Sequence, residues 1–180
     1  MGTAGSKELL MTKLTHYDGT CHARFVTFSC YRRLPFLNDI RAREILIEEI
    51  DRSRSKHGFK LFGYVLMPEH VHLVLSPAEN MKLGLVIREI KSLSAKRYFS
   101  LTSGAPRGNK RVFWQSRCYD HNCRSQQRTI EKIEYCHRNP VVSGLVKDMK
   151  EWAWSSYAGY HGLGNVRLRI DSIAPGTASK

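Results

Sequence analysis

The sequence lacks the features of a membrane-spanning, exported or disulfide-bonded protein. No apolar run approaches the roughly 18 residues that can span a bilayer, and residues 1–20 contain no apolar core of an export signal. The five cysteines form no CxxC pair, which argues against a zinc ribbon and against a disulfide framework. No internal repeat and no glycine-rich phosphate loop is present. We therefore expect a protein of the reducing cytoplasm with no membrane partner.

Acidic residues are also scarce. Only 16 Asp and Glu stand against 29 Lys and Arg among 180 residues, which gives a net charge of +13. So much positive charge on a small chain attracts polyanions, of which nucleic acid is the commonest. The length and the 42% of hydrophobic residues suit one globular domain with a real core. We expect a flexible lead-in over 1–20, one domain over 21–163, and a tail over 164–180 in which we expect disorder.

Hydrophobic periodicity predicts strands and helices in the order β-α-β-β-α-β-α. Strand composition occurs in four segments, 22–31, 59–66, 70–75 and 112–123. Helical spacing occurs in three, from residue 38 or 39 to 56, 82–100 and 126–139. Pro140 is expected to end the last helix. This order predicts an α+β fold of ferredoxin-like type, with helices packed on one face of an antiparallel sheet.

Two histidines, His70 and His72, flank Val71 in the predicted strand 70–75. Side chains alternate along a strand, so both imidazoles point to one face while Val71 points to the other. Neighbouring imidazoles can bind one divalent ion, and a shell completed by oxygen ligands accepts Mn²⁺ or Mg²⁺. Taken alone, such a pair is more often structural. A metal site also needs a third ligand and a group that uses the metal.

The predicted helix 126–139 offers candidates for both. Tyr135 and Asn139 are four residues apart and share a helical face, so the carboxamide oxygen of Asn139 can complete a His-His-Asn site. His137 points the other way on an ideal helix and is the second choice of ligand. A tyrosine becomes a nucleophile when a nearby cation or base takes up its charge or proton. An isolated helical tyrosine is more often a packing aromatic.

Basic residues near the middle of the chain are the predicted nucleic-acid contacts, because neutralised phosphates release counterions. They lie on the helix 82–100 and in the loop that follows it, at Arg88, Lys91, Arg107, Lys110 and Arg111. The alternative is that the helical members form only a solvated face.

Four motifs taken together resemble one family. LMPEHVHLVLSP, WQSRCYDH, YCHRNPVVSGLV and WAWSSY follow one another between residues 23 and 162. This series resembles the single-tyrosine HUH transposases, and more narrowly the REP-associated tyrosine transposases. The resemblance implies a ferredoxin-like fold, a homodimer and a divalent metal ion. It implies nicking and rejoining of single-stranded, hairpin-bearing DNA through a covalent 5′-phosphotyrosine.

The resemblance also assigns residues. The paired histidines map onto His70 and His72 and the nucleophile onto Tyr135, with Tyr119 in WQSRCYDH as the fallback nucleophile. In related insertion-sequence enzymes a glutamine one turn after the tyrosine binds the metal, and here that position is Asn139. Glu69 stands where the family often has asparagine.

The alternative function is a hairpin-DNA binding protein that has kept the fold and lost catalysis, with a structural or regulatory role. Intact His70, His72 and Tyr135 argue against that loss.

Overall fold

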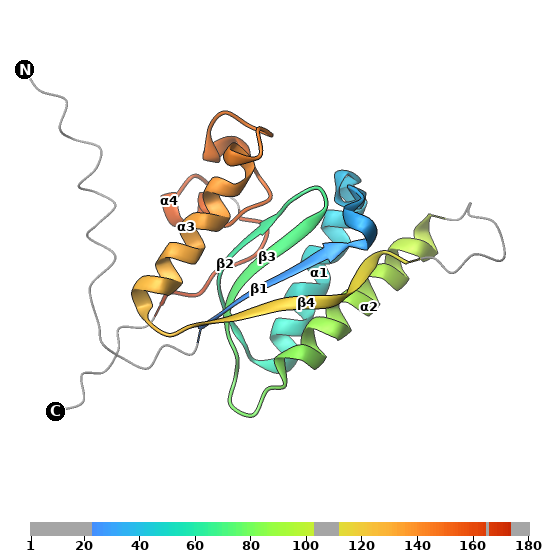
Figure 1. Ribbon diagram of the computed structural model, residues 1–180, viewed down its shortest axis with the longest axis horizontal. Helices are drawn as coiled ribbons and strands as arrows, with labels where there is room; N and C mark the ends of the chain where they lie inside the picture. Colours follow the sequence, from blue (N-terminus) through green and yellow to red (C-terminus); the bar gives the residue numbers. More distant parts are fainter. Residues whose placement is uncertain (1–22, 103–111, 165, 174–180) are drawn as a thin grey trace, which may run out of the picture.

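The computed structural model describes residues 23–102, 112–164 and 166–173, and its centre is a four-stranded antiparallel sheet in the order β2-β3-β1-β4 (Figure 1). The strands are β1 (Ala23–Cys30), β2 (Lys60–Leu66), β3 (His70–Ser76) and β4 (Trp114–Cys123). With a helix after β1 and another after β3, this is the ferredoxin-like topology that the sequence predicts. The expected lead-in over 1–20 lies outside the described residues.

Helices α1 (Ile40–His57) and α2 (Leu83–Leu101) pack on one face of the sheet over the larger hydrophobic core. Strand alternation supplies this core from every second residue, such as Val71, Leu73 and Leu75 of β3. Helix α1 begins after Asp39, whose carboxylate accepts a hydrogen bond from the backbone N–H of Arg41 at 3.0 Å.

Helix α3 (Gln126–Val142) packs on the opposite face, as Figure 1 shows. There it meets a smaller core that includes Phe25, Val74 and its own Ile133. The approach to β2 is close, because a Cβ added at Gly63 would lie 3.0 Å from Cγ1 of Ile133. The α+β class is confirmed, but the expectation that helices cover one face only is corrected. The strands carry apolar residues on both faces, and α3 covers the second.

The expected end of α3 at Pro140 is also corrected. Pro140 lies inside the helix, which continues to Val142. The proline lacks the N–H of one helical bond, yet Ser143 N–H still donates to the carbonyl of Asn139 at 2.9 Å. Asn139 lies within the helix, one turn after Tyr135, as the predicted helix 126–139 requires.

The C-terminal part holds β2 and α3 in place through the short helices η3 (Met149–Glu151) and α4 (Tyr157–His161) and the WAWSSY segment between them. Trp152 donates its indole N–H to the carbonyl of Leu66 at 3.1 Å. Residues 166–173, part of the expected tail, pack against the domain. Leu168 is buried, and Asp171 accepts a hydrogen bond from the backbone N–H of Leu61 at 2.8 Å. Across 23–102, 112–164 and 166–173, no helix has the length and apolarity to cross a membrane.

Candidate active site

The two histidines of β3 lie side by side on the α3 face of the sheet. They pair with β1 at Ser29 and Thr27, and only 7% of His70 and 5% of His72 is exposed. Their Nε2 atoms are 3.0 Å apart. Strand alternation therefore produces two buried imidazoles whose Nε2 edges meet.

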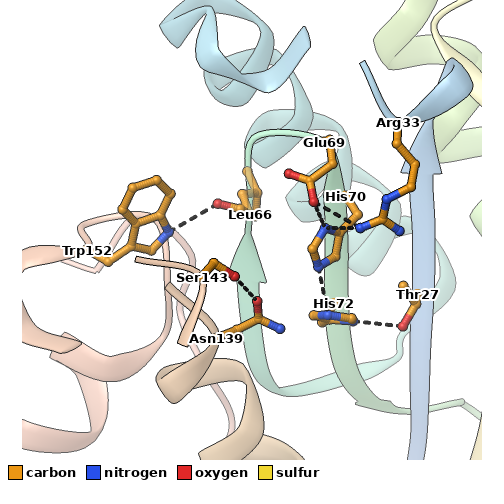
Figure 2. Close-up of polar contacts among 9 residues, drawn as sticks. All are labelled: Thr27, Arg33, Leu66, Glu69, His70, His72, Asn139, Ser143 and Trp152. Carbon is orange, nitrogen blue, oxygen red and sulfur yellow. Dashed lines mark hydrogen bonds and ion pairs between the residues drawn. The ribbon is translucent and has the colours of Figure 1, made fainter. Parts of the chain in front are cut away.

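Each histidine is held at its other nitrogen by a neighbouring side chain (Figure 2). The Nδ1 of His70 lies 2.9 Å from Oε1 of Glu69, which also accepts from Arg33 at 2.9 Å. The Nδ1 of His72 lies 2.7 Å from the Thr27 hydroxyl. Such partners fix the ring orientation and leave the Nε2 atoms of the two rings directed at each other.

Both imidazoles are neutral at neutral pH. Burial lowers the pKa of His72 to about 3, and burial also lowers the pKa of His70. Burial acts to raise the pKa of Glu69, but the hydrogen bond with His70 and the charge of Arg33 outweigh it, so this pKa lies below its usual value. A neutral imidazole beside an ionised carboxylate is the form that binds a metal.

One assignment of donors and acceptors satisfies the three hydrogen bonds that join Glu69, His70, His72 and Thr27. His70 donates from Nδ1 to Glu69, His72 donates from Nε2 to Nε2 of His70, and Thr27 donates to Nδ1 of His72. A hydroxyl can also accept, so Thr27 equally supports the tautomer of His72 in which both Nε2 atoms carry lone pairs. In that tautomer the two Nε2 lone pairs lie close enough for both nitrogens to bind one divalent ion.

Tyr135 faces the histidines from α3. Its ring centre lies 5.4 Å from that of His72, and Phe25 contacts both rings, at 5.0 Å from His72 and 5.8 Å from Tyr135. The tyrosine is 45% exposed. An open cleft of about 570 Å³ lies between the two elements, and His70, His72 and Tyr135 all line it. A phosphate entering this cleft would meet the phenol and the imidazoles together.

Asn139 lines the same cleft and is 9% exposed. Its Oδ1 accepts from Ser143 at 3.4 Å, and Figure 2 shows the amide nitrogen on the side of the histidines. A half-turn of the amide exchanges oxygen and nitrogen and would present the oxygen to a metal. Among the described residues no three His, Cys, Asp or Glu side chains form a metal-binding group.

His137 and Tyr119 are not brought to the cleft. His137 points from α3 toward the C-terminal part, where its Nε2 lies 2.9 Å from the Ser156 hydroxyl and burial lowers its pKa to about 4. Tyr119 lies on β4 opposite Thr27 of β1, on the face of the histidines, and is 58% exposed. It does not line the cleft between the histidines and Tyr135.

The predicted DNA contacts do not surround this cleft. Arg88 lies on α2, which packs on the other face of the sheet. Lys91 is buried, its ammonium donates to the carbonyl of Ser116 at 3.0 Å, and burial lowers its pKa. Neither residue therefore lies beside Tyr135, because α2 packs on the face away from α3. The loop residues Arg107, Lys110 and Arg111 lie outside the described residues.

A basic groove beside Tyr135 was missed by sequence reasoning. It has a volume of about 640 Å³ and shares Tyr135 and Arg138 with the cleft. Its other lining residues are His121, Asn122, Arg124, Arg128, Glu131 and Lys132. The spacing of Arg124, Arg128 and Lys132 at every fourth residue is the sequence signal that could have revealed it.

Comparison with known proteins identifies one family. Residues 18–139 match the family described as "Transposase IS200 like". A REP-associated tyrosine transposase of Escherichia coli is 25% identical over 115 residues, 63% of this chain and 64% of that protein. A Haemophilus influenzae protein, provisionally named a REP-associated tyrosine transposase, is 22% identical over 129 residues, which are 65% of this chain and 73% of that protein.

A solved structure shares the fold. It is described as a REP-associated tyrosine transposase bound to a REP hairpin, and it superposes with a TM-score of 0.66 at 21% identity over 93% of this chain and 97% of that one. Together with the sequence matches, the fold and the site define an enzyme of the transposase class. The chain belongs to the IS200-like transposase family, as its four motifs imply.

Proposed function

We propose that this protein nicks and rejoins single-stranded, hairpin-bearing DNA through a covalent 5′-phosphotyrosine on Tyr135. A divalent ion, Mg²⁺ or Mn²⁺, is held by His70 and His72 with Asn139 as the third ligand. The observation that carries this proposal is the distance of 5.4 Å between the rings of Tyr135 and His72 across one cleft.

The side chains of the cleft divide the work. The phenolic oxygen of Tyr135 forms a bond to phosphorus while the bond from phosphorus to the 3′ oxygen breaks, and the phenolic proton is balanced by the new 3′ hydroxyl. Arg33 and Arg138 line the cleft and provide positive charge toward the phosphate. A bound divalent ion supplies polarisation of the phosphate and stabilises the departing oxygen.

Rejoining needs no nucleotide triphosphate. The phosphotyrosine keeps the energy of the broken phosphodiester, so attack by another 3′ hydroxyl restores DNA and frees Tyr135. Hairpin DNA is the substrate we infer, because the solved relative of the same fold is described in complex with a REP hairpin. We further propose that the protein acts in the cytoplasm as a homodimer; light scattering in solution tests the latter.

The test is formation of an adduct that survives SDS. The protein is mixed with Mn²⁺ and a labelled hairpin oligonucleotide with single-stranded flanks. We expect an adduct from the wild type and a loss of at least about 1,000-fold for Tyr135→Phe, with Tyr119→Phe as the matched control that keeps it. Persistence of the adduct in Tyr135→Phe would overturn the nucleophile. Tight hairpin binding without any adduct, in either metal, would favour the catalytically silent binding protein.

A further inference from the structure

We propose that the basic groove beside Tyr135, together with the exposed rings of β4, is a track for the unpaired nucleotides next to the scissile phosphate. Bases stack on Tyr119 and His121, while phosphates face Arg124, Arg128 and Lys132. The inference rests on the proposed function, since it names where that reaction's DNA strand lies.

The groove is continuous with the place of chemistry. Tyr135 and Arg138 line both the groove and the catalytic cleft. Lys132 connects them further, because its ammonium lies 5.8 Å from the ring centre of Tyr135 and 4.7 Å from that of Phe25. A strand whose phosphate sits at Tyr135 would enter this groove without crossing the body of the protein.

The charge of the groove suits a phosphodiester backbone. Arg124, Arg128 and Lys132 follow one another at intervals of four residues, from just before α3 into its second turn. No acidic residue lies in the first turn of α3, where the helix dipole adds positive potential. The only carboxylate among the lining residues, Glu131, is bound to Arg128 at 2.8 Å. The described groove therefore has an excess of cations.

Strand β4 provides the surface for bases. Residues 116–122 are exposed although they lie in a sheet. The pairing of Thr27 with Tyr119 and of Phe25 with His121 places both rings on the face of the catalytic histidines. The rings are 6.2 Å apart and almost parallel, with an angle of 5° between them. Exposed, aligned rings on a sheet are a stacking platform for unpaired bases.

Stacking on such rings requires free base faces, which a duplex hides. The track is therefore specific for single-stranded DNA adjoining a hairpin rather than for the hairpin stem. In this proposal Tyr119 binds a base and takes no part in the chemical step, consistent with its position outside the catalytic cleft.

The test measures binding without metal, so that cleavage does not enter. Fluorescence anisotropy compares a labelled hairpin that carries single-stranded flanks with the same hairpin cut blunt. We expect Tyr119→Ala to weaken binding of the flanked hairpin about 10-fold, Tyr119→Phe to stay within about twofold, and the blunt hairpin to be unaffected by either. His121→Ala repeats the experiment at the second ring.

The phosphate contacts are tested separately. Arg124→Ala with Arg128→Ala should weaken the flanked hairpin and lower the salt dependence of binding by about two charges. Arg88→Ala, an exposed arginine on the other face, is the matched control and should change nothing. Circular dichroism verifies that each variant is folded.

Equal losses for flanked and blunt hairpins, an unchanged Tyr119→Ala, or tighter binding of an RNA of the same sequence would each overturn the track. None of these results affects the separate adduct assay, in which the wild type either forms the Tyr135 adduct or does not. Failure of the track and failure of the proposed function are therefore distinguishable.

Discussion

The two faces of the sheet are built from the same strands and behave differently. On the face of α1 and α2, alternate residues such as Phe28 and Leu73 form a closed apolar core. On the face of α3, residues one position away, His72 and Thr27, form a polar group at the wall of an open cleft. Neighbouring residues of one strand therefore contribute to a closed apolar core on one face and to an open polar cleft on the other.

Buried polar or charged side chains occur on both faces, and their surroundings differ. Beneath α1 and α2, the ammonium of Lys91 donates to a backbone carbonyl at 3.0 Å, and Arg97 donates to the carboxylate of Glu49 at 2.6 Å. In the cleft, His70 and His72 are fixed at Nδ1 while their Nε2 atoms meet 3.0 Å apart. The first arrangement pairs each charged group with a partner inside the core, although one carboxylate oxygen of Glu49 has no hydrogen-bond partner. The second brings two imidazole nitrogens together at the wall of a cleft.

The largest effect should follow from removing one of those ligand atoms. We expect His72→Ala to abolish Mn²⁺ binding in isothermal titration calorimetry and to lower adduct formation by at least about 100-fold, since a metal supplies several kcal/mol to such a step. His121→Ala, on the same face but outside the cleft, serves as the control for metal binding. Undiminished Mn²⁺ affinity in a folded His72→Ala protein would show that the metal lies elsewhere.

A smaller effect should follow from changing what holds a ligand. Glu69→Gln removes the carboxylate that accepts from His70, and we expect Mn²⁺ affinity to fall about 10–100-fold. Nitrogen NMR of His70 should show the loss of its single tautomer. Glu131→Gln in the neighbouring groove is the matched carboxylate control. If both variants bind Mn²⁺ equally well, Glu69 does not position His70.

The pH dependence of stability tests the role of His137. Its pKa is about 4 in the folded protein, against about 6.5 in an unfolded chain. The unfolded chain therefore binds more protons between these values, so stability falls as pH drops from about 6.5 to 4, by roughly 3 kcal/mol from this residue. Urea unfolding of the metal-free protein should show a shallower decline in His137→Ala.

The same variant separates a structural from a ligating His137. Loss of the contact with Ser156 should lower stability, yet Mn²⁺ affinity should be unchanged, because His137 faces the C-terminal part of the chain. A fall in Mn²⁺ affinity would restore His137 as a ligand. The lowered pKa of His72 affects the wild type and His137→Ala alike, so the difference between their stabilities as a function of pH is due to His137.

The smallest effect is expected at Lys91. Its ammonium is buried beneath α2, so Lys91→Met should leave the affinity for the flanked hairpin within about twofold. The same substitution on the other face, Lys132→Met, should weaken it about fivefold through one lost phosphate contact. Equal effects in the anisotropy assay would remove the distinction between the faces for DNA binding.

Much of the secondary structure was predictable because its causes are local. Periodicity located the four strands and three long helices to within a few residues, and the alternation of His70, Val71 and His72 foretold two imidazoles on one face. Helical spacing likewise brought Asn139 beside Tyr135. These relations depend only on residues within one turn or two strand positions of each other.

Most of what the sequence did not reveal concerns contacts between distant segments. The burial of Lys91 against Ser116 cannot be read from a helix that looks basic on its surface. The contact of Asp171 with Leu61 joins residues 110 positions apart. The end of α3 is a local exception, since the helix continues past Pro140 to Val142. Charge composition predicts a polyanion partner, but it does not indicate which face of the sheet would bind it.

The sequence by itself determined which side chains could share a surface: the histidine pair, the tyrosine with its asparagine, and the basic residues at every fourth position. Only the tertiary structure decided that α3 covers the face opposite α1 and α2, and thereby brings Tyr135 over His72. The physical reason is that local geometry sets the direction of a side chain within its element. Burial of apolar surface on both faces of the sheet determines where that element packs.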